Sequence, residues 1–314
     1  MAAVFDVADF LHPLDTSARR QLESVPMLES AVKKYLSAVK ERRTHQALLV
    51  NALRLGPHQL PDVYKMLPPI CEAFGIAEPE LYLMQGPANA VTVGHVNAAI
   101  VIYSDLLEDL AEDEIQAVIA HECGHIMAQH TLYRQMAAAM VGAGETVAAS
   151  SVVGQAAGIA IQSTLANWYR KSEFTADRAA VAFFGNPEPL QRALFHLLGV
   201  PKWMPAEVSY SAFIEQAGEF DKITESKWDR FLARSLESGS SHPLPALRMR
   251  ELTTWAQSHT FEQLMEIAKH GGPRGLACGQ CGQRLSPEWR FCQFCGAAVP
   301  QIATTGTGDQ REPV

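Results

Sequence analysis

The chain has 314 residues, of which 47% are hydrophobic and 19% charged, and its formal net charge is −8. This length suits two domains, or one large domain with a small appendage, and the apolar fraction excludes wholesale disorder and collagen-like repeats. The acidic balance argues against broad nucleic-acid binding, because neutralising phosphates requires clustered lysines and arginines.

The N-terminus and the cysteines predict a cytoplasmic protein. The first residues, MAAVFDVADFLHPLD, contain no basic stretch followed by an apolar core, so no signal peptide is indicated. Cys71 and Cys123 stand alone, and the other four cysteines form two C-x-x-C pairs near the C-terminus. A disulfide-stabilised secreted domain would spread its cysteines through a short chain.

The first third of the chain is predicted to be mainly helical. Apolar residues recur at helical spacing from about residue 15 to 54, and Pro26 divides this run into at least two helices. A further helix is expected over about 62–74. Two β-prone runs, 80–84 and 98–103, are separated by turn residues and predict strands of a small antiparallel sheet.

Helices are expected to dominate the rest of the chain to about residue 255. Acidic residues at its start favour a long helix over AEDEIQAVIAHECGHIMAQH, residues 111–130. The small-residue stretch 136–166 contains Glu145 inside any window long enough to span a membrane. We therefore favour two closely packed helices there over a membrane span.

A metal-binding motif lies late in the predicted helix 111–130. His121, Glu122 and His125 form H-E-x-x-H within HECGH. Residues four apart share a helix face, so both imidazoles can point at one metal ion. Glu122 is offset by about 100° and can reach a metal-bound water without ligating the metal. Two helix histidines packed without a metal are the alternative.

A third ligand is sought downstream of this motif. Ala128 and Thr131 exclude the metzincin pattern, and His130 is one position short and is expected to face elsewhere on the helix. Glu173 offers a carboxylate on a second helix, which would complete a His₂Glu site with one open position. Asp177 follows one turn later and could orient a ligand imidazole, or pair with a neighbouring arginine instead.

These motifs give the chain a resemblance to a known family. HECGH (121–125), SEFTADRAA (172–180) and HPLPALRMREL (242–252) resemble the gluzincin metallopeptidases of metallopeptidase family 48, which includes HtpX and the type I CaaX prenyl proteases. The resemblance extends over most of residues 11–260, including the N-terminal HPLD run at 12–15. The chain lacks the multi-pass membrane segments of the best-known members, so it looks like a soluble branch.

The resemblance implies roles for individual residues. Glu173 takes the place of the glutamate ligand, and Asp177 that of the aspartate beside it. His242 matches the family's His-Pro motif and is expected to stabilise the oxyanion, with Arg248 as its downstream arginine. Asn89, on the predicted sheet edge, is expected to lie beside the substrate cleft.

The mechanism implied is hydrolysis of a peptide bond assisted by zinc. The metal lowers the pKa of its bound water to about 7, and Glu122 takes the proton as general base. His242 steadies the tetrahedral oxyanion, and Glu122 returns the proton to the leaving amine. An edge strand near residues 89–95 would hold an extended substrate.

The four C-terminal cysteines predict a second, structural zinc site. The two C-x-x-C pairs are ten residues apart and can complete a closed Cys₄ site, as in a zinc ribbon, with Cys278, Cys281, Cys292 and Cys295 as ligands. Metal binding would then drive the folding of about 25 residues that lack a core. A redox dithiol pair and two disulfides are the alternatives.

The sequence therefore predicts an α+β protein: a mainly helical zincin-like metallopeptidase domain with a small antiparallel sheet, and a small C-terminal zinc ribbon. The expected segments are a peptidase domain over 1–270 (helices 1–75, catalytic core 76–260), a linker 271–275, the ribbon 276–300 and a disordered tail 301–314.

The expected function is that of a zinc-dependent endopeptidase acting on unfolded or damaged proteins, with one catalytic and one structural zinc. Protein or peptide substrates are the expected partners, and neither nucleic acid nor a membrane is favoured. A latent peptidase-fold scaffold or chaperone-like protein whose ribbon recruits partners is the alternative.

Overall fold

The computed structural model describes residues 5–24, 41–135, 152–204, 209–223 and 245–269, and in the cysteine region 276–278, 280, 284–285, 290–292 and 295–298. His242, Cys281, the linker 271–275, the tail 301–314 and residues 136–151 of the small-residue stretch lie outside them. The predicted fold class is confirmed, because the described residues form a mainly helical body with one small four-stranded sheet.

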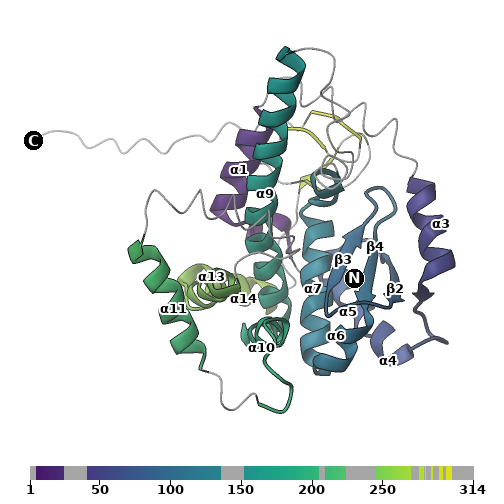
Figure 1. Cartoon of the computed structure of the whole chain (residues 1–314), viewed down its shortest axis with the longest axis vertical. Helices are drawn as coiled ribbons and strands as arrows, with labels where there is room; N and C mark the ends of the chain where they lie inside the picture. Colours follow the sequence, from purple (N-terminus) through teal and green to yellow (C-terminus); the bar gives the residue numbers. More distant parts are fainter. Residues whose placement is uncertain are drawn as a thin grey trace, which may run out of the picture.

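Along the chain, helices precede and follow the strands of the main sheet (Figure 1). The helices are η1 (Val7–Asp9), α1 (Pro13–Glu23), α3 (Glu41–Asn51), α4 (Pro61–Tyr64), α5 (Leu67–Phe74), α6 (Ser104–Asp109), α7 (Glu112–Met127), α9 (Val152–Phe184), α10 (Glu188–Leu197), α11 (Tyr210–Ile223), α13 (Pro245–Ala256) and α14 (His259–Lys269). The strands are β1 (Leu53–Arg54), β2 (Glu80–Met84), β3 (Ala90–Val93), β4 (Ala99–Tyr103), β5 (Leu276–Ala277) and β6 (Arg284–Leu285).

The main sheet is mixed, so the prediction of an antiparallel sheet is wrong in this detail. Its strand order is β1-β2-β4-β3, and β2 pairs with β4 in parallel, while the other two pairings are antiparallel. The chain leaves β2, passes over one strand position to form β3, and returns as a hairpin to fill that position with β4. β4 is therefore internal and its first four residues are buried, whereas β3 is an edge strand.

Helices α7 and α9 pack closely because a glycine, Gly124 of α7, lies at the point where they meet. A Cβ placed on Gly124 of α7 would lie 2.7 Å from the Cβ of Ala179 and 3.2 Å from the Cα of Ala176, both on α9. Such distances leave no room for any larger residue. Three acidic residues in the first turn of α7 complement the positive end of its helix dipole. The close approach brings the motif on α7 directly against α9.

The core surrounds this helix pair. Apolar side chains of α5, β4, α7, α9, α10 and α13 belong to one buried cluster, and α1 and α13 both contact α9. Figure 1 shows α9 as the long teal helix with α7 and the sheet on one side of it. Within the described ranges, no helix is both long and apolar enough to cross a membrane.

Candidate metal centre and active site

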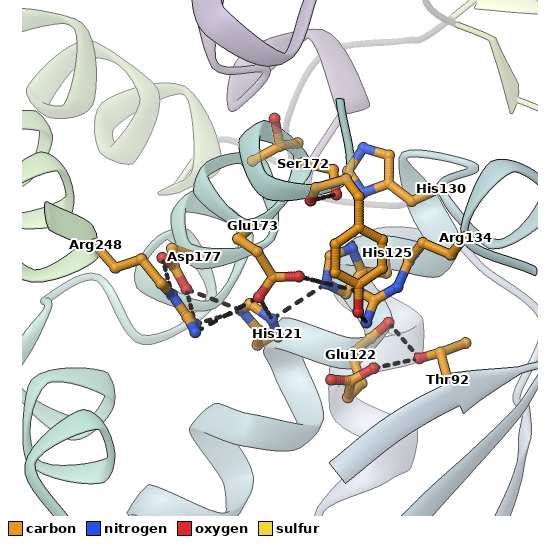
Figure 2. Close-up of polar contacts among 12 residues, drawn as sticks. Thr92, His121, Glu122, His125, His130, Arg134, Ser172, Glu173, Asp177 and Arg248 are labelled. Carbon is orange, nitrogen blue, oxygen red and sulfur yellow. Dashed lines mark hydrogen bonds and ion pairs between the residues drawn. The ribbon is translucent and has the colours of Figure 1, made fainter. Parts of the chain in front are cut away.

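Three predicted ligands converge between α7 and α9. The Nε2 atoms of His121 and His125 lie 3.2 Å apart. Glu173 of α9 places Oε2 3.4 Å from His121 Nε2 and Oε1 3.3 Å from His125 Nε2. All three side chains are almost fully buried. Figure 2 shows the carboxylate of Glu173 pointing at the two imidazoles.

The spacing of these ligand atoms fits a tetrahedral zinc ion. Ligands 2.0–2.1 Å from a tetrahedral centre stand about 3.3–3.4 Å from one another. The three observed separations, 3.2, 3.3 and 3.4 Å, have this size. Two imidazole nitrogens and one carboxylate oxygen are also the donor set of catalytic zinc sites, which leave a fourth position open.

Glu122 lies beside this triangle, held by the edge strand. Its Oε2 accepts a 2.6 Å hydrogen bond from the hydroxyl of Thr92 on β3. Its Oε1 is buried and has no hydrogen-bond partner among the described residues. Ligand atoms of His121, Glu122 and His125 fall within 4.8 Å of one another, so Glu122 is close to the same point. We assign the third ligand to Glu173 because its oxygens contact both imidazoles, whereas Glu122 is turned toward Thr92 (Figure 2).

Asp177 and Arg248 fix the orientation of His121. Asp177 Oδ1 lies 2.9 Å from His121 Nδ1. Arg248 of α13 donates two hydrogen bonds to the same carboxylate, from Nε at 2.8 Å and from Nη2 at 2.6 Å. Burial opposes the charged form of Asp177, but Arg248 and His121 outweigh it and lower its pKa. The imidazole is thus oriented by a carboxylate that is itself held on both oxygens.

The two histidines have opposite electrostatic surroundings. Burial disfavours the charged form of His121, yet its hydrogen bonds to Asp177 and Glu173 raise its pKa to about 9. Burial lowers the pKa of His125 well below its ordinary value, and the positive charge of Arg134 adds to this effect. The carboxylates around His121 therefore favour a cation at this point of the site.

Arg134 is a member of the site that the sequence did not indicate. Its Nη1 donates to Glu173 Oε1 at 3.3 Å, and its Nη2 donates to the hydroxyl of Tyr169 at 3.0 Å. The guanidinium also lies 4.7 Å from the centre of the Tyr169 ring. Arg134 follows the motif by nine positions, and only the turn between the helices brings it back onto Glu173.

His130 is also in the site, although we expected it to face elsewhere on the motif helix. That expectation is wrong because α7 ends at Met127, and Gln129 has the left-handed φ of 54°. The chain then turns back and sets His130 Nδ1 2.8 Å from Nδ1 of His125. Asp15 of α1 lies 3.0 Å from the other nitrogen of His130. No spacing in a single sequence links residues 15 and 130.

The remaining substrate and oxyanion assignments stay predictions. Asn89 immediately precedes β3, and its side-chain Oδ1 accepts a 2.9 Å hydrogen bond from the backbone of Ala90. Its backbone oxygen accepts from Tyr103, which caps the β3–β4 pairing. Asn89 therefore shapes the start of the edge strand. His242 lies outside the described residues.

The C-terminal cysteines form a second candidate metal site. Sulfur atoms of Cys278, Cys292 and Cys295 lie within 4.8 Å of one another, and those of Cys278 and Cys295 are 3.6 Å apart. Tetrahedral Zn–S bonds of 2.3 Å place sulfurs about 3.8 Å apart. These three thiols therefore fit a zinc thiolate site. The fourth predicted ligand, Cys281, lies outside the described residues.

A short antiparallel pairing flanks each C-x-x-C pair, which we call a knuckle. β5 and β6 pair on either side of the first knuckle. Around the second knuckle, Phe291 bridges to Ala298, and the backbone N–H of Gly296 donates to the Cys292 oxygen at 2.7 Å. Gly296 has a φ of 73°, which favours glycine.

The helix pair and its ligand geometry, set beside the edge strand of a small sheet, define the class of protein as a metalloprotease. A family model, Peptidase family M48, matches residues 57–256. Since this match covers more than half of the chain, the chain belongs to peptidase family M48. The resemblance drawn from the sequence motifs is thereby confirmed.

Individual relatives are similar over most of the peptidase region. The chain is 31% identical over 266 residues to the plastoglobule-localized metallopeptidase 48, chloroplastic, of Arabidopsis thaliana, covering 84% of this chain and 76% of the relative. It is 29% identical over 232 residues to a protease HtpX homolog of Trichormus variabilis, covering 64% and 76%. It is 26% identical over 243 residues to a protease HtpX homolog of Gemmatimonas aurantiaca, covering 68% and 81%. No solved structure matches the chain.

Proposed function

We propose that this metalloprotease is a zinc-dependent endopeptidase whose catalytic ion is held by His121, His125 and Glu173. The observation that carries the proposal is the convergence of ligand atoms between α7 and α9. The two Nε2 atoms are 3.2 Å apart, and one oxygen of Glu173 lies 3.4 Å from His121 Nε2 while the other lies 3.3 Å from His125 Nε2. Asp177 and Arg248 keep the triangle in place by orienting His121. The donor set suits zinc, which prefers imidazole and carboxylate ligands in this number.

Zinc bound there would polarise the scissile carbonyl and make a water molecule more acidic. Glu122 accepts the proton of the attacking water and delivers it to the leaving amine. The hydrogen bond from Thr92 anchors one carboxylate oxygen and leaves the buried Oε1 available for this transfer. We assign stabilisation of the oxyanion to His242, by the resemblance to family 48.

We propose that the substrate binds as an extended strand along β3. β3 is at the edge of the sheet, and its Thr92 touches the general base. A peptide that adds to this edge would therefore pass the zinc site with its backbone fixed by main-chain hydrogen bonds. Only an extended or unfolded segment can pair in this way, which favours unfolded or damaged proteins as substrates. Asn89, where the edge strand begins, would contact this segment.

A structural zinc in the ribbon completes the proposal. Cys278, Cys292 and Cys295 supply three close thiols, and Cys281 is the fourth ligand in the repeated knuckle pattern. We place the peptidase domain at residues 1–270 and the ribbon at 276–300, joined by the linker 271–275. We also propose a cytoplasmic location, because the cysteines suit a metal site in a reducing compartment better than a disulfide framework.

Cleavage of a disordered protein tests this function. Casein is incubated with the zinc-loaded chain and with Glu122→Gln, and products are identified by mass spectrometry. We expect internal cuts by the wild type and none by the variant. Failure of both proteins to cut, with zinc bound to each, would contradict the proposal and favour a scaffold or chaperone-like role.

A further inference from the structure

A buried chain of polar groups connects the N-terminal helix α1 to the ligand His125. His125 Nδ1 lies 2.8 Å from His130 Nδ1, and His130 Nε2 lies 3.0 Å from Asp15 Oδ2. The same Asp15 oxygen accepts a 2.6 Å hydrogen bond from the hydroxyl of Thr175 on α9. The exposed fraction of His130 is 0% and that of Asp15 is 1%. The sequence analysis rejected His130 as a third ligand and assigned no role to Asp15, the last residue of the HPLD run.

The backbone after α7 is shaped to make this contact. Gln129 adopts a φ of 54°, which residues other than glycine rarely take. The backbone N–H of His130 donates to the backbone oxygen of His125 at 2.9 Å. This turn sets the His130 ring edge-on to His125, with centroids 5.1 Å apart. Trp168 of α9 packs edge-on against the other side of the His130 ring at 5.4 Å. The imidazole is held in one orientation.

The direction of each hydrogen bond follows from the acceptor at its end. An ionised carboxylate can only accept, so His130 donates its Nε2–H to Asp15. The Nδ1 of His130 then carries a lone pair and accepts from Nδ1–H of His125. This leaves the Nε2 lone pair of His125 directed at the point where His121 Nε2 and Glu173 also converge.

We propose that Asp15 and His130 are positioning residues for the metal ligand His125, so that α1 is part of the metal centre. This inference rests on the proposed zinc site. His121 is oriented directly by a carboxylate, Asp177, whereas His125 is oriented through a second histidine backed by a carboxylate from α1. Partners of this kind fix the tautomer and orientation of a ligand imidazole, and their loss typically lowers metal affinity about 10- to 100-fold.

The test measures zinc affinity of the purified full chain by competition with a chromophoric chelator. His130→Phe keeps a ring of similar size but cannot accept from His125. Asp15→Asn removes the charge that holds the His130 proton. We expect both variants to bind zinc about 10- to 100-fold more weakly. His130→Gln offers an amide oxygen to His125 and an amide N–H to Asp15, and we expect it to recover most of the affinity.

A matched control separates positioning from packing. Thr175→Val removes the other hydrogen bond to Asp15 Oδ2 and the acceptor of the His12 backbone N–H, but leaves the contact of Asp15 with His130, and we expect its zinc affinity to stay within about threefold of the wild type. Circular dichroism and thermal melting of the metal-free proteins show whether each variant is folded. If His130→Phe unfolds, Asp15→Asn and His130→Gln carry the test.

The double variant His121→Ala/His125→Ala lacks two of the proposed catalytic ligands, so any zinc that it retains is bound by the ribbon. This amount is subtracted from the zinc measured for each of the other proteins. Unchanged affinity in folded His130→Phe and Asp15→Asn would overturn the inference and leave the proposed function intact. A loss no larger than that of Thr175→Val, or none recovered by His130→Gln, would overturn it as well. If the wild type holds no more zinc than the double alanine variant, the proposed function itself is wrong.

Discussion

At the scale of single residues, the site balances its buried charges. Glu122, Glu173 and Asp177 place three carboxylates around the ligand triangle, and Arg134 and Arg248 contact two of them. With both ligand histidines neutral, as metal binding requires, one negative formal charge remains, which a divalent cation would more than offset. Because both arginines contact Glu173, its carboxylate has fixed partners before a metal arrives. The ion pairs with Arg134 and Arg248 therefore hold the carboxylate of Glu173 in position for metal binding.

Thr92 gives a prediction about the general base. Thr92→Val removes the hydrogen bond that anchors Glu122 Oε2 and keeps the shape of the side chain. A hydrogen bond to a charged group contributes about 1.5–3 kcal/mol, so we expect kcat/KM to fall about 10- to 100-fold. Zinc content should not change. Thr92→Ser keeps the hydroxyl and should retain most of the activity, and full activity in Thr92→Val would show that Glu122 needs no anchor.

The buried ion pair of Asp177 gives a prediction about stability. Asp177→Leu leaves the Arg248 guanidinium buried beside His121 without its bidentate partner. Removing one member of such a pair typically costs about 3–5 kcal/mol, and we expect a loss of this size in the free energy of unfolding. Urea denaturation of the metal-free protein measures it. Lys269→Gln breaks an exposed pair with Glu266 and should change little; equal effects would contradict the account.

How far these residues could be predicted depends on their spacing along the chain. His121 and His125 lie on one face of α7, and Glu173 and Asp177 on one face of α9, so helical periodicity grouped each pair. The ligand role of Glu173 came from the resemblance to family 48. Thr92, Asp15 and the place of His130 in the site were not predicted, for a physical reason: these residues reach the site through a strand edge, a separate helix and a left-handed turn, respectively. Such contacts depend on tertiary packing, which a single sequence does not display.

At the scale of elements, the site depends on how closely α7 approaches α9. The ligands come from both helices, so their separation sets the size of the ligand triangle. The sequence predicted the motif helix and the strands 80–84 and 98–103 almost as observed. It did not predict β1, because a strand of two residues is too short to show an alternation of apolar and polar side chains. It also did not predict the parallel pairing of β2 with β4, which arises because β3 forms at the sheet edge and the chain then turns back between β3 and β2.

Gly124 provides the test of this helix contact. Gly124→Ala places a methyl group 2.7 Å from the Cβ of Ala179, so the helices must separate or shift. We expect the free energy of unfolding to fall by about 1–3 kcal/mol, as is usual for an overpacked core, and zinc binding to weaken with it. Gly56→Ala meets no atom within 4 Å and serves as the control. Unchanged zinc affinity and stability in Gly124→Ala would show that the helix spacing is not critical.

At the scale of the whole molecule, two candidate metal sites lie in parts of the chain that differ in how they fold. The candidate catalytic site is surrounded by the main buried cluster, and two described cysteines of the ribbon, Cys278 and Cys292, belong to that same cluster. The described ribbon residues otherwise form two short antiparallel pairings, and a segment of this kind depends on its metal for folding. Because the ligands of the two sites are separate side chains, we expect each site to lose its metal without the other.

Cys292→Ser tests this independence. The variant removes one thiol of the ribbon site, and we expect it to lose one equivalent of zinc per chain while casein cleavage continues. Metal analysis by mass spectrometry, with hydrogen exchange over residues 276–298, measures both effects. Cys71→Ala, a buried cysteine outside the ribbon, should keep both ions. Loss of both ions in Cys292→Ser would show that the ribbon supports the catalytic site.

We propose that Glu173 ligates zinc and that Glu122 performs the proton transfer. Zinc affinity and casein cleavage of Glu173→Gln and Glu122→Gln, measured side by side, distinguish these two roles. We expect Glu173→Gln to lose the zinc that depends on His121 and His125, and Glu122→Gln to keep it, with cleavage abolished in both. Loss of this zinc in Glu122→Gln, with Glu173→Gln still loaded and active, would exchange the two roles and contradict the account.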